Sequence, residues 1–249
     1  MSLIQGYLRA VAADDRQALC TGPFDVFLDR DSDHPYSNYA IPRDGAEPSR
    51  ESIAELVTVM QRAARLPRVE FLPAAAPAAA DARLEYGFEE QLRTPLMTRR
   101  AEDAEPSELP EGIDVAQLGP DAEREQVEGL MRALALAFDE PFDPSIVDST
   151  ASRFTRRIAV LAYADEEIAG GGMCLEPVGG VVELVGIGVR EEFRGRGIGT
   201  TVTAELARLA FESGVDLAFL TPGAESTARI YERAGFERTD VMLHLTHRS

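Results

Sequence analysis

The sequence predicts an α/β (α+β) fold in which helices flank a mixed, mostly antiparallel central sheet. Three observations lead to this prediction. Apolar runs with strand character alternate with segments whose apolar residues recur at helical spacing. Short turns join three consecutive strands of the C-terminal half, which makes those strands antiparallel. An acidic, proline-containing stretch at residues 101–112, AEDAEPSELPEG, interrupts the pattern and is typical of a linker.

The elements after this linker follow one another closely. The first part predicts a short strand at Ile113–Val115, a helix at 121–138 and a second helix at 145–157. Strands are then expected at 158–164, 168–176 and 181–189, with turns at Asp165-Glu166 and Gly179-Gly180. The order ends with a helix at 198–213, a strand at 216–220, a helix at 225–234 and a strand near 240–246.

The N-terminal half carries a weak copy of the end of the chain. Residues 69–100 align without a gap to residues 217–248, and 9 of the 32 aligned positions are identical. Each segment also follows a stretch of helical pattern, at 50–66 and 198–213. Self-similarity at a fixed offset predicts a duplication, with two related halves in one chain.

The charge of the chain excludes one large class of partner. Acidic residues number 43 and basic residues 25, all of them arginine, which gives a formal net charge of −18 over 249 residues. A field this negative repels phosphate backbones, so we expect no nucleic-acid partner. It is compatible with a cationic amine as a ligand.

The positions of the cysteines, histidines and apolar residues argue against a metal site and against a membrane-spanning helix. Two cysteines and three histidines are scattered without the spacing of a zinc site, so no metal is expected. No apolar run is long enough for a membrane-spanning helix, and the first residues lack the pattern of a secretory signal. We therefore expect a cytoplasmic protein with no membrane partner.

The most informative stretch lies between the strand ending at Val189 and the helix beginning near Ile198. Glycines allow main-chain N–H groups to turn toward a ligand, and a helix N-terminus adds unpaired donors and a positive dipole end. These features predict a site for a diphosphate. The residues expected to form it are Arg194, Gly195, Arg196, Gly197, Ile198, Gly199 and Thr200. The stretch lacks the ending of a P-loop, and its third glycine comes one residue too early for a dinucleotide loop.

Two motifs together resemble the GNAT superfamily of N-acetyltransferases. Arg194-x-x-Gly197-x-Gly199 after a strand is similar to the acyl-CoA diphosphate loop of that family. Residues 228–236, ARIYERAGF, are similar to its A-x-x-Y-x-x-x-G-F segment, and they follow at the family's distance. The resemblance covers about residues 110–247. It implies a catalytic GNAT domain at 113–249 that uses acetyl-CoA as co-substrate.

The resemblance also implies how the donor is held. In the family the strand before the loop parts from its neighbour, and the pantetheine arm pairs with the exposed edge. Main-chain groups of Ile187 and Val189 would hold this arm, and an N–H near Val189 would polarise the thioester carbonyl. Many members carry an asparagine seven residues before the tyrosine, where this chain has Ala224, so Ser226 is expected to take over that contact.

The chemistry of the reaction and the resemblance together indicate two catalytic residues. An alkylamine has a pKa of about 10 and must lose a proton before it attacks, and Glu183 in an apolar strand is the expected general base. Its side chain could instead face solvent, with Glu176 as the second choice. Tyr231 stands where the family has its general acid, which would protonate the leaving thiolate. A core position on its helix is the alternative for Tyr231.

The resemblance assigns different roles to the two halves. Residues 1–100 would form a degenerate GNAT-like domain, since they lack the glycine loop and hold Arg83 where the other half has Tyr231. The expected function is transfer of an acetyl or other acyl group from acyl-CoA to a primary amine of a small molecule or peptide. The alternative is a module that senses acyl-CoA without turnover. A homodimer is possible, and the sequence does not predict which amine is the acceptor.

Overall fold

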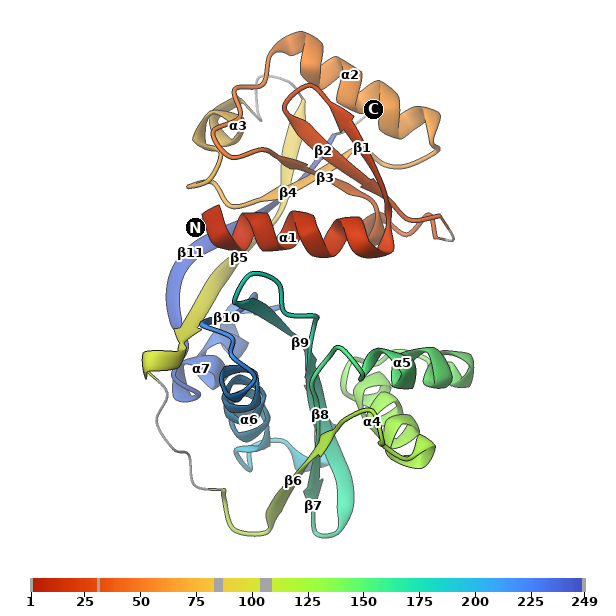
Figure 1. Cartoon of the computed structure of the whole chain (residues 1–249), viewed down its shortest axis with the longest axis vertical. Helices are drawn as coiled ribbons and strands as arrows, with labels where there is room; N and C mark the ends of the chain where they lie inside the picture. The colour runs from red at the N-terminus through yellow and green to blue at the C-terminus, as the bar shows by residue number, and fades with distance from the viewer. Residues whose placement is uncertain (1, 31, 83–86, 104–108, 248–249) are drawn as a thin grey trace. The chain divides into compact units, whose positions relative to one another are not determined.

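The computed structural model describes residues 2–30, 32–82, 87–103 and 109–247. It divides into two compact units. Unit 1 contains Met1–Leu96 and Thr239–Ser249, and unit 2 contains Met97–Arg238 (Figure 1). Arg83 and part of the expected linker, residues 104–108, lie outside the described residues.

Unit 1 consists of a small sheet with three helices. Its helices are α1 (Ser2–Asp15), α2 (Arg50–Arg62) and α3 (Pro77–Ala82). Its strands are β1 (Gln17–Thr21), β2 (Phe24–Leu28), β3 (Tyr39–Pro42) and β4 (Arg68–Phe71), together with portions of β5 (Phe88–Arg100) and β11 (Glu237–His247). A short 3-10 turn, η1 (Pro35–Ser37), precedes β3.

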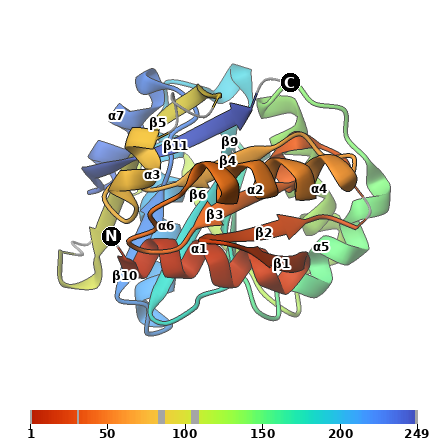
Figure 2. The same cartoon turned by 90° about the horizontal axis from the view of Figure 1, so that it is seen from above.

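Helices α1 and α2 cover opposite faces of this sheet (Figure 2). Residues of α2 pack on one side of β2, where Val26 is fully buried, while Phe27 on the other side packs with α1. This arrangement follows from the alternation of side chains along a strand. Leu243 and Leu245 of β11 belong to the α2 side of the core, where β11 pairs antiparallel with β4.

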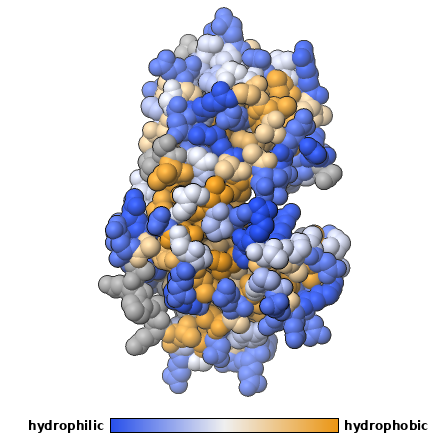
Figure 3. Space-filling view, in the orientation of Figure 1, coloured by the Kyte–Doolittle hydropathy of each residue, from blue (hydrophilic) through white to orange (hydrophobic). Residues whose placement is uncertain are grey.

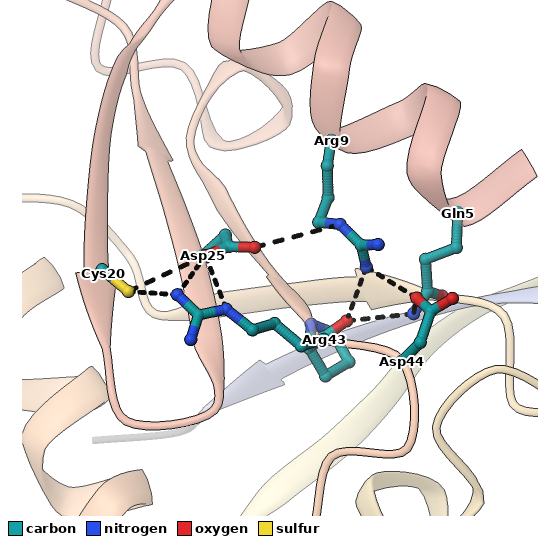
Figure 4. Close-up of polar contacts among 7 residues, drawn as sticks. Gln5, Arg9, Cys20, Asp25, Arg43 and Asp44 are labelled. Atoms are coloured by element: carbon teal, nitrogen blue, oxygen red, sulfur yellow. Dashed lines mark hydrogen bonds and ion pairs between the residues drawn. The ribbon is translucent and has the colours of Figure 1, made fainter. Parts of the chain in front are cut away.

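A polar cluster ties α1 to the end of β3 (Figure 4). Arg9 forms an ion pair of 2.8 Å with Asp44, and Gln5 donates to the carbonyl of Pro42 at 2.9 Å. Arg43 bonds to the Asp25 carboxylate at 2.9 Å and also contacts the Cys20 thiol. These contacts fix the loop that leads toward α2.

Unit 2 contains the segments with the sequence motifs. Its helices are α4 (Arg124–Ala137), α5 (Val147–Arg153), α6 (Ile198–Glu212) and α7 (Glu225–Arg233). Its strands are β6 (Ile113–Leu118), β7 (Ala159–Ala164), β8 (Glu167–Cys174), β9 (Val181–Val189) and β10 (Leu217–Leu220). Short 3-10 turns are η2 (Ala101–Asp103), η3 (Pro144–Ile146) and η4 (Glu191–Phe193).

The sheet of unit 2 lies between α4 and α6 (Figure 1). Strands β6 to β9 pair in antiparallel order, and β10 joins β9 in parallel. Val202 and Leu206 of α6 pack on one face, and Leu130 and Leu134 of α4 pack on the other. The predicted mixed, mostly antiparallel sheet flanked by helices is therefore confirmed.

The same order of elements occurs twice along the chain. Helix α2, β4, α3 and β5 follow one another as α6, β10, α7 and β11 do. Arg50 and Ile198, which begin the first helices, are as far apart in sequence as Val69 and Leu217, which begin the aligned segments. The end of β5 pairs with β10 in unit 2, whereas the end of β11 pairs with β4 in unit 1.

On the face drawn in Figure 3, hydrophilic residues surround several apolar areas. Hydrophilic residues cover much of both units on the face drawn in Figure 3, in keeping with 27% charged residues. Among the helices that the structure describes, none combines the length and apolar character needed to cross a bilayer.

Candidate active site

A bulge changes the direction of β9 just before its end. Gly171 pairs with Gly188 and Met173 pairs with Val185, so β9 carries one extra residue between these pairs. Gly186 in this interval has φ of +60°, which glycine adopts at little cost. After the bulge the side chains of Ile187 and Val189 turn to the face covered by α6, where Val182 and Leu184 also lie.

The partner strand leaves β9 before this bulge. Strand β10 pairs with Val181–Glu183 of β9, and within the described residues its parallel pairing goes no further. The last third of β9 therefore presents an edge beside β10 that no described strand covers. Glu183 marks the point at which the two strands part.

The main chain of Val189 points to that edge. The N–H of Arg190 donates to the carbonyl of Ala169 at 2.9 Å, so Arg190 and Ala169 form a hydrogen-bonded pair across β8 and β9. Hydrogen-bonded and non-bonded pairs alternate in an antiparallel ladder. The adjacent pair, Gly170 and Val189, is consequently non-bonded, and the N–H of Val189 is directed away from β8.

The loop after β9 ends at a helix N-terminus that has no side-chain cap. Gly195 and Gly197 have φ of +80° and +85°, and Gly197 is the N-cap of α6. An added Cβ at Gly195 would meet nothing within 4 Å, so this main chain faces open space. The first N–H groups of a helix lack partners within the helix, and α6 presents them here beside its positive dipole end.

A pocket of about 520 Å³ connects the strand edge, the loop and α7. Its lining combines three segments of unit 2 that are distant in sequence. The lining residues are Ala137, Phe138, Ile187, Gly188, Val189, Phe193, Arg194, Gly195, Gly197, Ile198, Gly199, Thr200, Thr227, Ile230, Tyr231 and Arg233. It therefore includes Tyr231 and eight of the ten residues predicted to bind the donor.

Tyr231 lies on α7 and is partly buried against the core that α6 covers. Its hydroxyl has no hydrogen-bond partner among the described residues. Burial raises the pKa of this phenol above its ordinary value, because the phenolate would lose solvation. At neutral pH the side chain therefore holds its proton at the wall of the pocket.

The two arginines of the loop are engaged by the protein itself. Arg194 donates from Nε to the carbonyl of Val189 at 3.1 Å and from Nη2 to the carbonyl of Ala137 at 3.0 Å. It thus joins the end of β9 to the C-terminus of α4, whose last carbonyls lack helical partners. Arg196 forms an ion pair of 2.6 Å with Asp165 and does not line the pocket.

The remaining predicted residues lie elsewhere. Glu183 is partly buried on β9 and is not part of the pocket lining. Glu176, the second choice, accepts a hydrogen bond of 2.7 Å from Arg156. Ser226 is exposed on α7 and does not line the pocket. Its neighbour Thr227 lines the pocket. Thr227 Oγ1 donates to the carbonyl of Ala224 at 2.7 Å.

Sequence reasoning missed several lining residues. Thr227, Ile230 and Arg233 recur at three-residue intervals on α7, a spacing that places them along one side of a helix, and this signal could have been read from the sequence. Phe138, which is 49% exposed, reaches the pocket from the end of α4. Only the tertiary fold brings α4 to this position.

Unit 1 has a different helix start at the corresponding place. The N-cap of α2 is Ser49, whose Oγ accepts from the N–H of Ser52 at 3.2 Å. In return the N–H of Ser49 donates to Oγ of Ser52 at 2.9 Å. This capping box satisfies main-chain N–H groups at the start of α2, whereas the start of α6 has no side-chain cap. In the part of the chain that the structure describes, no group of three or more His, Cys, Asp or Glu side chains could hold a metal ion.

Comparison with known proteins identifies the segment that carries this pocket. Residues 127–236 match the sequence model of the Acetyltransferase (GNAT) family. A search of curated proteins gives no match.

Solved structures with a similar fold span nearly the whole chain. A GCN5-related N-acetyltransferase from Kribbella flavida has 26% identity and a TM-score of 0.84, over 100% of this chain and 95% of that one. A GCN5-related N-acetyltransferase from Sphaerobacter thermophilus has 19% identity and a TM-score of 0.63, over 90% of this chain and 76% of that one. A tandem GNAT protein from the clavulanic acid biosynthesis pathway has 16% identity and a TM-score of 0.64, over 91% of this chain and 78% of that one.

Proposed function

We propose that the protein is an N-acetyltransferase that uses acetyl-CoA, because residues 127–236 match the sequence model of the Acetyltransferase (GNAT) family. The observation that carries the proposal is the pocket shared by the edge of β9, the uncapped start of α6 and Tyr231. The acceptor we propose is a primary amine of a small molecule or peptide.

The chemistry of the pocket suits the donor. The open amides at Gly195–Thr200 offer hydrogen bonds and a dipole to a diphosphate, as helix N-termini do for anions. The uncovered edge of β9 offers main-chain groups to the amides of a pantetheine arm, in the manner of an added strand. The N–H of Val189 would donate to the thioester oxygen as negative charge develops on it.

The reaction requires two proton transfers by the protein. Acetyl-CoA supplies a thioester whose carbonyl carbon accepts the amine nitrogen, so that a C–N bond forms while the C–S bond breaks. Glu183 at the parting of β9 and β10 would take the proton of the amine, directly or through water. Glu176, which accepts a hydrogen bond from Arg156, stays the second choice.

The departing sulfur needs the second proton. Tyr231 is the proposed donor, because its pKa is raised by burial and its hydroxyl stays protonated at neutral pH. The thiol that forms has a pKa of about 8.5. Its thiolate can still receive the proton when the phenol lies beside it in the transition state.

The test is release of free thiol from acetyl-CoA over a panel of primary amines. The assay is repeated with propionyl-CoA and a longer acyl-CoA, and a blank without acceptor corrects for hydrolysis and for the exposed Cys20 thiol. We expect amine-dependent release that is matched by the acylated amine in mass spectrometry.

Calorimetry with CoA separates the alternatives. Binding without turnover on any amine would favour a sensor of acyl-CoA over an enzyme. Absence of both binding and thermal stabilisation would remove the proposal altogether, because a ligand bound only to the native state must raise Tm.

A further inference from the structure

The last residues of β5 belong to unit 2, although they come from the N-terminal half of the sequence. Residues 97–100 of this strand pair antiparallel with β10, and they precede the segment 127–236 that matches the family model. Arg99 lies directly opposite Ala218 in this pairing. Directly opposite side chains lie on the same face of a sheet, and Ala218 belongs to the core that α6 covers. The side chain of Arg99 therefore lies on the α6 side of the sheet.

Arg99 is buried against the C-terminal turn of α7. The residue is only 8% exposed. A Cβ added to Gly235, which follows the C-cap Ala234 of α7, would lie 2.9 Å from Nε and 3.2 Å from Cζ of Arg99. The guanidinium thus packs against main chain at the end of α7, at a point where a side chain on residue 235 would not fit.

This turn is hydrogen-bonded to the main chain of Tyr231. The N–H groups of Ala234 and Phe236 both donate to the carbonyl of Tyr231, each at 3.0 Å. The N–H of Gly235 donates to the carbonyl of Glu232 at 3.0 Å. Hydrogen bonds of this kind close the C-terminus of a helix. A displacement of Gly235 is therefore transmitted to the backbone of Tyr231.

The positive charge of Arg99 suits its position beside the end of α7. The carbonyl groups of the last turn give a helix C-terminus a partial negative charge, and a cation beside it is stabilising, more so when it is partly buried. Removal of a guanidinium from water is costly without such compensation. Both the packing and the charge of Arg99 therefore fix the last turn of α7 against β5.

We propose that Arg99 is a positioning residue of the active site, which holds the last turn of α7 and thereby keeps the hydroxyl of Tyr231 at the departing sulfur. This inference rests on the proposed function. A general acid must lie within hydrogen-bond reach of the atom that it protonates, and a displacement of about 1 Å can cost about 100-fold in rate. The N-terminal half of the sequence thus supplies a residue that the general acid requires, outside the segment that matches the family model.

The experiment measures kcat and KM for acetyl-CoA in the full chain with a saturating acceptor. Arg99→Met removes the charge and leaves an apolar side chain, a change that buried sites often tolerate in stability. It should lower kcat by about tenfold or more with little change in KM, since Arg99 does not line the pocket. Arg99→Lys keeps a charge at the helix end and should recover part of this loss.

All variants are assayed well below their Tm, so that unfolding is not counted as lost turnover. If Arg99→Met does not fold, Arg99→Lys carries the test. It lacks the planar guanidinium that packs against Gly235, and its kcat should still lie below that of the unmodified protein.

Arg238→Gln is the matched control on the same helix. Arg238 of β11 contacts α7 through ion pairs with Glu225 at 2.5 Å and Glu232 at 3.0 Å. Its side chain is 41% exposed, and exposed ion pairs contribute little, so this variant should keep the kcat of the unmodified protein.

Four outcomes would count against the inference. An unchanged kcat in Arg99→Met overturns it and leaves the proposed function standing. An equal loss of kcat in Arg238→Gln also overturns it, because any disturbance of α7 would then suffice. A rise of KM without loss of kcat assigns Arg99 to donor binding instead. Absence of amine-dependent thiol release by the unmodified protein defeats the proposed function and the inference with it.

Discussion

At the scale of single residues, the site depends on which polar groups the protein satisfies by itself. Arg194 is part of the glycine-loop motif, yet its guanidinium donates to the carbonyls of Val189 and Ala137. Its charge therefore stabilises the contact between β9 and α4 near the pocket. The main-chain amides of the loop remain as donors for an anionic ligand.

Tyr231 provides the residue-scale prediction. Tyr231→Phe should lower kcat by about 100-fold or more, the range of a lost general acid, while KM for acetyl-CoA changes little, because phenylalanine fills the same space. Steady-state kinetics with a saturating acceptor measures both constants. Burial raises the pKa of Tyr231 above the ordinary phenol value of about 10, so its hydroxyl stays protonated below that pH. Loss of this proton should therefore not reduce kcat below about pH 10.

Tyr163→Phe serves as the control for this prediction. Tyr163 lies on β7 and packs with the core that α4 covers, outside the pocket lining. This variant should retain turnover. Unchanged kcat in Tyr231→Phe would show that another group or water protonates the thiolate.

At the scale of elements, the bulge of β9 and the early end of β10 create the exposed edge. The bulge shifts β9 by one residue, and Ile187 and Val189 consequently face α6. Strand β8 must approach this distorted segment closely, which explains why it is rich in glycine. An added Cβ at Gly170 would lie 2.3 Å from the carbonyl oxygen of Gly188 and 3.0 Å from Cα of Val189.

Gly170→Ala is the prediction at this scale. The clash is with main-chain atoms that have no rotamer to relieve it, so we expect a loss of about 1–3 kcal/mol in the free energy of unfolding, as in overpacked cores. Urea denaturation measures it. Gly119→Ala is the matched change, since a Cβ there meets nothing within 4 Å, and it should stay within about 0.5 kcal/mol. Equal stability of the two variants would contradict the close approach of β8 to the bulge.

At the scale of the whole molecule, two similar runs of elements carry one candidate donor site. Helix α6 begins at Gly197 and leaves its first amides open, whereas α2 begins at Ser49 within a capping box. The proposal that unit 1 is a non-catalytic copy is supported by this difference, because a diphosphate would have to displace bonds already made.

The corresponding prediction concerns stoichiometry. Calorimetric titration with CoA should give one site per chain. Ser49→Ala should lower the free energy of unfolding by about 1 kcal/mol through loss of the cap, without changing the Kd of CoA. A stoichiometry of two, or a change of CoA affinity in Ser49→Ala, would assign a donor site to unit 1.

The sequence determined the elements of unit 2 and the loop of the candidate site. Hydrophobic periodicity placed a strand at 181–189 and helices beginning near 198 and 225, and the structure has these elements with nearly the same bounds. These features are local, because side-chain spacing and glycine content act within a few residues of the chain. The glycine loop and Tyr231 were visible for the same reason.

The tertiary structure alone decided how these pieces combine. Alternation along β9 would place Ile187 and Leu184 on opposite faces, and the bulge at Gly186 brings them to the same one. Ala137, whose carbonyl accepts from Arg194, lies 57 residues away in sequence, so no spacing rule predicts that contact. Long-range pairing and packing set these contacts, and they exist only once the chain has folded.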